Sequence, residues 1–407
     1  MRYLGNKVRL LPEIEAAARR IGFTRGTVCD LFAGTATVGH YFRARGNSVV
    51  ATDLMECSYV FQRVLLELEA PPEFAKLRTA IDVPTVRVPA SARKRRVVWG
   101  AAFESAQRVL NFLSAGIEPV AGFVTRQYSP EGVAGRCYFR PETAQRIDAV
   151  LLALRDWRAR DLIDDDERNF LLAALINAAD GSANISGTYG AYHKDWQDNT
   201  SRPFVLLPPE EFADAAAFGP RGVAHRREAS EWLPSVKADL LYIDPPYNNR
   251  QYAPNYHLLE TLARIPTETN LAALEASLYG KTGMLPWTDK SSRLCRSSGR
   301  DCAEAFRELL QSTSIPRVVI SYNEEGLITR DEFLEMLAEY ADVPRAELGD
   351  DVLTEISYRR FRSDADGRVS STGTGRSYRQ LAGRDRNEVN EWLFHVAKSS
   401  VAKRRRA

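Results

Sequence analysis

The chain has 407 residues, a formal net charge of +2, 44% hydrophobic residues and 27% charged residues. These values are ordinary for a soluble globular protein and exclude a surface that is basic all over. The length allows one large domain with insertions, or two or three domains.

Two kinds of signal predict a cytoplasmic protein. The N-terminal stretch MRYLGNKVRLLPEI has no apolar signal-peptide core, and no apolar run approaches the length of a membrane span. The 5 cysteines include no CxxC pair, which favours reduced thiols over a zinc site or a disulfide framework. We therefore expect no membrane association and no metal.

The first predicted elements form a strand–helix–strand unit. Residues 10–20 predict a helix, and residues 26–34 predict a buried strand that ends at Asp30 and leads into a glycine turn. Residues 37–46 predict a helix closed by Gly46, and residues 48–54 a second strand that ends at Asp53. The short links predict parallel strands with a right-handed crossover.

The next part of the chain, residues 71–200, has helical patterns and predicts an insertion between the halves of an α/β sheet. Buried strands are expected again at 238–244 and 316–322, with a second, partly irregular insertion at about 253–315 between them. The Gly/Ser-rich stretch 359–381 predicts a mobile loop, and 389–398 a final strand. The predicted catalytic domain thus has two parts, 1–70 and 201–407.

A distinctive stretch, LLYIDPPY at 240–247, ends the strand expected at 238–244 and continues beyond it. An Asp-Pro pair often does no more than end a strand. Here, however, Pro245 and Pro246 fix the backbone and remove two donors beside the carboxylate of Asp244 and the ring of Tyr247. Ligands bind at this end of strands in open α/β sheets. A carboxylate, a carbonyl and an aromatic face suit a planar base that carries an amino group.

The glycine turn DLFAGTATVG departs from both phosphate-binding patterns. Ala36 stands where the dinucleotide pattern has its middle glycine, and the Gly-Lys-Ser/Thr ending of a P-loop is absent. Asp30 at the turn favours a cofactor with a cationic or zwitterionic end, and Asp53 is spaced to bind the hydroxyls of a ribose. S-adenosylmethionine has these parts.

Four motifs together resemble those of the alpha-group, Dam-like DNA adenine-N6 methyltransferases of the FokI type. RYLGNK (2–7) is similar to the motif that holds the methionine end of the cofactor, with Tyr3 and Lys7 in the contact places. DLFAGTATVG resembles the cofactor loop, and ATDL the segment with the ribose acid. DPPYNNRQY, followed by NYHLLET, resembles the catalytic motif. Cofactor motifs that precede the catalytic motif, with a helical insertion between them, are typical of the alpha group.

The resemblance implies a Rossmann-like, doubly wound, mostly parallel sheet and a site-specific enzyme that methylates adenine N6 in flipped-out bases of duplex DNA. The implied catalytic residues are Asp244, Pro245, Pro246 and Tyr247. The implied cofactor-binding residues are Tyr3, Lys7, Asp30, Phe32, Ala33, Gly34, Thr35, Asp53 and Asp244. We expect Asn248, Arg250 and Tyr252 to line the DNA side of the pocket with Tyr247.

The helical insertion is expected to read the DNA sequence. Its candidate contacts, each of which could equally be an ordinary surface residue, are Arg126, Tyr128, Lys194, Trp196 and Arg202. Glu228 is the candidate acid near the adenine of the cofactor. The expected partners are duplex DNA and a cognate restriction endonuclease or defence system. Two alternatives stay open: an RNA adenine-N6 methyltransferase, and a catalytically silent protein that binds a cofactor or nucleic acid.

Overall fold

The structure is a computed structural model that describes residues 5–88, 100–213, 218–247, 251–295, 299–359 and 388–399. Its strands are β1 Thr27–Asp30, β2 Ser48–Thr52, β3 Val223–His225, β4 Leu240–Ile243, β5 Arg317–Asn323, β6 Leu353–Arg359 and β7 Glu388–Ala397. Its helices are α1 Leu11–Arg20, α2 Thr37–Arg43, α3 Glu56–Gln62, α4 Ala75–Ala80, α5 Glu104–Ala115, α6 Phe123–Tyr128, α7 Pro141–Ala159, α8 Asp165–Ser182, α9 Ala229–Trp232, α10 Tyr252–Arg264, α11 Leu271–Ser277, α12 Gly299–Ser312 and α13 Arg330–Ala341.

The strands form one sheet in the order β3-β2-β1-β4-β5-β7-β6. Strands β3, β2, β1, β4 and β5 pair in parallel, and β7 runs antiparallel to both of its neighbours. The chain moves outward from β1 to β2 and β3, and then outward the other way from β4. The predicted doubly wound, mostly parallel α/β sheet is therefore confirmed, and its topological switch point lies between β1 and β4.

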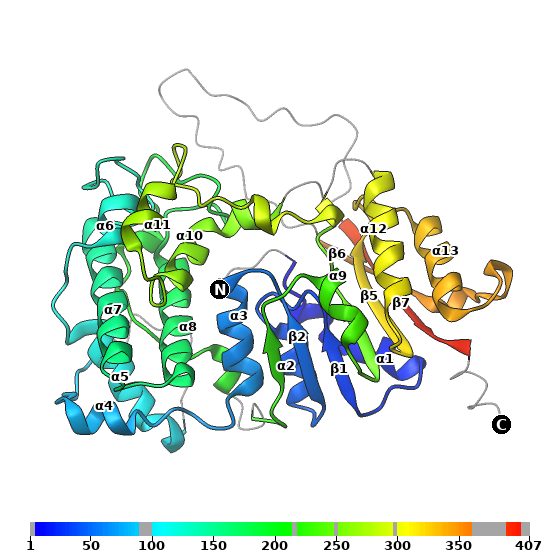
Figure 1. The fold of residues 1–407 in the computed structure, drawn as a ribbon, viewed down its shortest axis with the longest axis horizontal. Coiled ribbons are helices and arrows are strands. Elements are labelled where there is room, and N and C mark those ends of the chain that lie inside the picture. Colours follow the sequence, from blue (N-terminus) through cyan, green and yellow to red (C-terminus); the bar gives the residue numbers. More distant parts are fainter. Residues whose placement is uncertain are drawn as a thin grey trace.

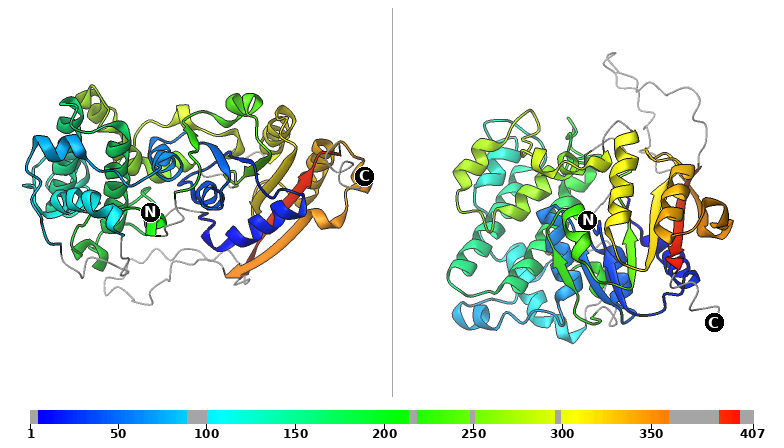
Figure 2. Two further views of the ribbon diagram at one scale, coloured as in Figure 1. Left: turned by 90° about the horizontal axis from the view of Figure 1, so that it is seen from below. Right: turned by 45° about the vertical axis from the view of Figure 1, so that its right-hand side comes forward.

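Helices cover both faces of the sheet. Ile14 of α1 and Phe42 of α2 pack in one core, whereas Trp232 of α9, Phe306 of α12 and Phe333 of α13 pack in the other. Figure 2 shows α1 and α12 on opposite sides of the strands. Every residue of β4 is buried, because helices lie on both of its faces.

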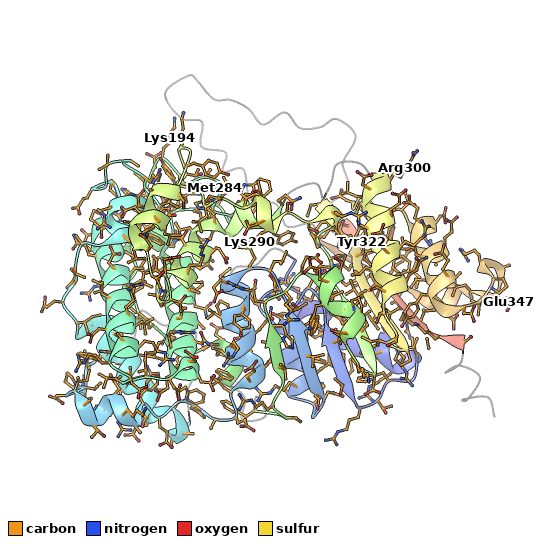
Figure 3. All side chains as sticks on the ribbon, viewed as in Figure 1. Lys194, Met284, Lys290, Arg300, Tyr322 and Glu347 are labelled. Carbon is orange, nitrogen blue, oxygen red and sulfur yellow. The ribbon has the colours of Figure 1, made fainter. Side chains whose placement is uncertain are left out.

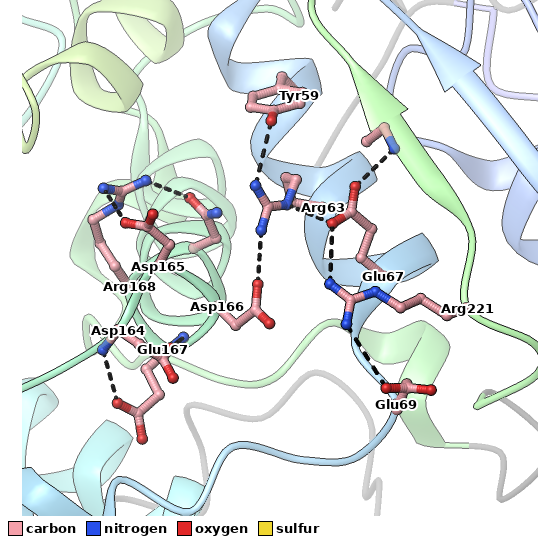
Figure 4. Close-up of polar contacts among 12 residues, drawn as sticks. Tyr59, Arg63, Glu67, Glu69, Asp164, Asp165, Asp166, Glu167, Arg168 and Arg221 are labelled. Carbon is pink, nitrogen blue, oxygen red and sulfur yellow. Dashed lines mark hydrogen bonds and ion pairs between the residues drawn. The ribbon is translucent and has the colours of Figure 1, made fainter.

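The helical lobe, which comprises α4–α8 with α10 and α11, lies beside the sheet next to α3 (Figure 1). Its helix α8 begins with a capping box made by Asp164 and Glu167. Figure 4 shows how Arg63, just after α3, joins the two parts: its guanidinium lies 2.9 Å from Asp166 of α8 and 2.9 Å from Glu67. Glu67 in turn accepts a hydrogen bond from the backbone of β3.

The predicted segments match most of the central elements. The helix at 10–20, the strands that end near Asp30 and Asp53, and the strands at 238–244, 316–322 and 389–398 correspond to α1, β1, β2, β4, β5 and β7. The strands β3 and β6 were not predicted. The stretch 253–315 is largely helical: α10 and α11 join the helical lobe, whereas α12 packs on the sheet. The loop expected at 359–381 lies almost entirely outside the described residues.

Candidate active site

Three acids meet where the carboxyl ends of neighbouring strands lie side by side. Asp30 ends β1, Asp53 follows β2 and Asp244 follows β4. They flank the switch point of the sheet, where open α/β folds bind ligands. A cavity at this edge is lined by Asp53 and Asp244, together with Phe32, Pro246 and Tyr252. The structure thus brings together residues from the predicted cofactor and catalytic motifs.

The glycine turn is held by two of these acids. The amide of Gly39 in α2 donates to Asp30 Oδ2 over 2.9 Å, and the amide of Gly34 donates to Asp53 Oδ2 over 3.0 Å. Ala36 has φ +60°, a left-handed conformation that glycine adopts more readily. The alanine therefore occupies the conformation that the middle glycine of a dinucleotide loop would favour.

Asp53 has a second backbone contact and faces the cavity. Its Oδ1 accepts from the amide of Met55 over 2.9 Å. Burial raises the pKa of Asp53 to about 6, although the backbone hydrogen bonds from Met55 and Gly34 oppose this shift. Burial also raises the pKa of Asp30 to about 7, against the hydrogen bond from Gly39. This edge of the sheet therefore favours a ligand that carries positive charge.

Asp244 shares a lysine with a second acid. Lys7 Nζ lies 3.1 Å from Asp244 Oδ1 and 2.7 Å from Glu391 Oε1 of β7. Burial raises the pKa of Asp244 to about 7; the Lys7 ammonium opposes this shift and the Glu391 carboxylate adds to it. Burial alone would lower the pKa of Lys7, but the two carboxylates raise it above its ordinary value. The N-terminal motif therefore contacts the catalytic motif directly.

Tyr247 presents its ring beside the Asp-Pro-Pro turn. The ring is half-buried and meets Tyr322 edge to face, with centroids 6.3 Å apart. The backbone of Tyr247 is anchored separately, because its carbonyl accepts from the amide of Leu327 over 3.0 Å. Tyr252, which lines the cavity, stacks with Tyr256 at a centroid distance of 6.3 Å.

The remaining predicted site residues have different positions. Tyr3, Asn248 and Arg250 lie outside the described residues. Ala33 and Gly34 are buried in the glycine turn, and Thr35 Oγ1 lies 3.3 Å from Thr37 Oγ1. Glu228 lines the cavity, but its carboxylate also caps α9 by accepting from the amides of Ser230 and Glu231.

Two of the predicted DNA contacts, one buried and one exposed, are paired with other groups of the protein. Tyr128 is fully buried and donates to the carbonyl of Gly283, so the suggestion that it contacts DNA is wrong for this conformation. Arg126 makes a two-pronged ion pair with Glu275, at 2.9 and 2.7 Å. Lys194 and Arg202 are exposed, and Figure 3 shows Lys194 projecting from the helical lobe. The Trp196 ring lies 4.8 Å from the guanidinium carbon of Arg140.

Three charged residues at or behind the cavity were not predicted from the sequence: Lys290, Glu260 and Glu391. Lys290 lines the cavity and forms an ion pair of 2.6 Å with Glu260 of α10, which also accepts from the amide of Cys57. Figure 3 places Lys290 near α3, in the segment between the helical lobe and the sheet. Glu260 belongs to the stretch NYHLLET that carried the resemblance, whereas DK at 289–290 has no comparable signal.

Comparison with known proteins gives the family. The model of the D12 class N6 adenine-specific DNA methyltransferases matches residues 3–92 and 118–323, which is more than half of the chain. The chain belongs to this family. The match includes the predicted N-terminal, cofactor and catalytic motifs.

Individual relatives agree with this assignment. The chain is 29% identical to the type II methyltransferase M.FokI of Planomicrobium okeanokoites, over 98% of this chain and 53% of the relative. It is 30% identical to the modification methylase StsI of Streptococcus sanguinis, over 89% and 49%. It therefore spans about half the length of these two relatives. The type II methyltransferase M.NlaIII of Neisseria lactamica is 28% identical over 89% of this chain and 93% of its own length.

Among the described helices, none combines the length and apolar character that crossing a membrane requires. Within the same described ranges, no group of three or more His, Cys, Asp or Glu side chains is arranged to hold a metal ion.

Proposed function

We propose that this chain transfers a methyl group from S-adenosylmethionine to the N6 amino group of adenine, at one short specific site in duplex DNA. The observation that carries the proposal is the position of Asp244. Its carboxylate borders the cavity at the switch point, beside the half-buried ring of Tyr247 and within 3.1 Å of Lys7. Family membership supports the same reaction.

The three acids at this edge of the sheet, of which Asp53 and Asp244 line the cavity, fit S-adenosylmethionine. Burial raises the pKa values of Asp30, Asp53 and Asp244 to about 7, 6 and 7, so each carboxylate gains when a cation lies nearby. When bound, this cofactor supplies an activated methyl group on a positively charged sulfur. Asp53 would accept hydrogen bonds from its ribose, and Asp30 would brace the glycine turn around it.

Asp244 would act on the adenine. The lone pair of the N6 amino group is delocalised into the ring, which makes this nitrogen a poor nucleophile. Hydrogen bonds from its two protons to Asp244 and to the Pro245 carbonyl would localise the lone pair and stabilise the developing positive charge. Methyl transfer to N6 would leave the C–S electron pair on sulfur, and one N6 proton would pass by way of the Asp244 carboxylate to solvent. Tyr247 would hold the flipped base by stacking.

We further propose that residues 71–200 form the target-recognition part. Lys194 and Arg202 are its strongest candidates for contacts with DNA, because both are exposed, whereas the exposed Arg126 is already paired with Glu275. By analogy with the relatives, which are named as type II and modification methyltransferases, we propose a role in restriction–modification with a cognate endonuclease, in the cytoplasm.

The test is methyl transfer by the purified protein. With labelled S-adenosylmethionine and a mixed-sequence duplex DNA, we expect label in N6-methyladenine. Asp244→Ala should lose transfer while isothermal titration still detects cofactor binding, because Asp30 and Asp53 remain. Labelling of RNA alone would support the RNA methyltransferase alternative, and cofactor binding without transfer to any substrate would support the silent one. Retention of transfer within about tenfold, or roughly 1.4 kcal/mol, in Asp244→Ala would show that this acid is not catalytic.

A further inference from the structure

A second buried carboxylate, Glu391, lies behind the proposed catalytic acid. It belongs to β7 and is 2% exposed. The Lys7 ammonium lies 2.7 Å from Glu391 and 3.1 Å from Asp244, so one positive charge is divided between two negative ones. The shorter contact goes to the acid that is farther from the cavity.

The fold holds Glu391 firmly in this position. Its strand pairs with β5 on one side and β6 on the other, and Glu391 itself is opposite Asn323 and Ile356. The hydroxyl of Ser321 in β5 donates to its carboxylate over 2.5 Å. Burying an extra carboxylate costs free energy unless it is paired and hydrogen-bonded, and this one is both. Its place beside Lys7, which also contacts Asp244, therefore calls for an explanation.

We propose that Glu391 is a positioning residue that holds the Lys7 ammonium away from full pairing with Asp244. The proposal deepens the proposed function and rests on it, because it assumes that Asp244 accepts a hydrogen bond from the adenine amino group. An undivided Lys7–Asp244 pair would engage the carboxylate, and the ammonium would compete with the amino group. The Lys7 ammonium pairs mainly with Glu391, so the Asp244 carboxylate stays able to accept a hydrogen bond from the base.

Because Lys7 is shared by two acids, replacing Glu391 or Lys7 should shift the ionisation of Asp244 in a predictable direction. Glu391 and Lys7 act on it in opposite senses, the acid disfavouring its carboxylate and the lysine favouring it. The other titratable groups that face it are Asp30 of β1, Tyr242 of β4, Tyr247 after β4 and Tyr252 of α10. None of these is altered when Glu391 or Lys7 is replaced. Glu391→Gln should therefore lower the titration midpoint of Asp244, and Lys7→Gln should raise it.

The first experiment reads this midpoint without any reaction. The protein is labelled with ¹³C at the aspartate carboxyl carbons, and the Asp244 signal is assigned by its loss in Asp244→Asn. In the cofactor-free protein we expect the midpoint to fall by about one pH unit in Glu391→Gln and to rise by about one unit or more in Lys7→Gln. Glu391→Asp keeps the charge and should stay within about half a unit of the unchanged protein.

A matched control replaces Glu355, an exposed acid on the neighbouring strand β6 that pairs with Arg330 at 3.2 Å. Glu355→Gln removes the same charge from the sheet but not from Lys7, and should move neither the midpoint nor the activity. Midpoints that stay fixed in both Glu391→Gln and Lys7→Gln would overturn the inference, because a purely structural glutamate predicts that result.

The second experiment measures the positioning role itself. At a pH about two units above the midpoint, where Asp244 is ionised in every variant, Glu391→Gln should reduce kcat by about tenfold or more. The acid limb of its pH profile should move down with the titration midpoint. An unchanged kcat would overturn the role even if the midpoint moved. Failure of the unchanged protein to transfer a methyl group would instead overturn the proposed function, and the titration would remain readable.

Discussion

At the scale of single residues, the side chain and the backbone of Tyr247 are held by different contacts. The ring contacts Tyr322 edge to face, whereas the main chain is fixed by the hydrogen bond from Leu327. A substitution at this position therefore changes the aromatic surface beside Asp244 and leaves the backbone anchor in place. This separation makes the proposed stacking role open to a clean test.

Replacing Tyr247 distinguishes stacking from packing. Tyr247→Phe keeps the aromatic face and should retain most of the activity. Tyr247→Ala should lose stacking worth about 1–3 kcal/mol, or roughly five- to 150-fold in productive binding. The measurements are methyl transfer, melting temperature and the fluorescence of a duplex with 2-aminopurine at the target position, which brightens when the base leaves the stack. An Ala variant that is stable and transfers methyl groups at the normal rate would contradict stacking.

At the scale of elements, α2 is tied to the chain on both sides of the segment that carries α4–α8. The guanidinium of Arg43, at the end of α2, is fully buried and donates to four carbonyls. Two belong to Leu65 and Leu68, before α4, and two to Gly219 and Pro220, after α8. One side chain thus joins the chain that leaves for α4–α8 and the chain that returns from them to the end of α2.

Arg43→Ala should destabilise the protein strongly. Its loss leaves four carbonyls without their donor, and we expect the free energy of unfolding to fall by about 3 kcal/mol or more in a denaturant titration. Arg45→Ala is the matched control: this arginine is exposed, and its 3.2 Å pair with Glu15 should contribute only about 1 kcal/mol or less. Equal losses in the two variants would show that the buried network contributes little.

The strand ends also predict how cofactor binding depends on pH. The pKa values of Asp30, Asp53 and Asp244, about 7, 6 and 7, lie above the value near 4 of an unfolded chain. The folded protein therefore holds more protons, and the contribution of these groups to stability falls as the pH rises from about 4 to about 7. A bound cation should offset this loss, because it favours the ionised carboxylates.

Calorimetry can measure this effect. Between about pH 5.5 and 7.5, the affinity for S-adenosylmethionine should rise as the three acids ionise. S-adenosylhomocysteine lacks the positive sulfur. The factor by which its affinity rises over the same range should therefore be about tenfold smaller than the factor for S-adenosylmethionine. Parallel pH dependences for the two compounds would mean that the carboxylates do not act on the sulfonium charge.

At the scale of the whole molecule, the sequence predicts the central strands and the acids that follow them. Short apolar runs that end in Asp30, Asp53 and Asp244 can be recognised in the sequence, because a buried strand is apolar and the acid that follows it is not. β3 has only three residues and lies at the edge of the sheet, so its signal is weak. Glu391 lies within a stretch predicted as a strand, where an acid suggests a solvent-facing position. Only the pairing of β7 with β5 places it against Lys7.

We propose above all that this chain methylates adenine N6 in DNA at one defined site. The most direct test is long-read sequencing of DNA from a methylation-deficient host that expresses either the unchanged gene or Asp244→Ala. We predict N6-methyladenine at nearly every copy of a single short sequence with the unchanged gene, and at none of them with the variant. Genomic DNA without N6-methyladenine, despite soluble and folded protein, would contradict the claim. So would a pattern that is the same for both genes.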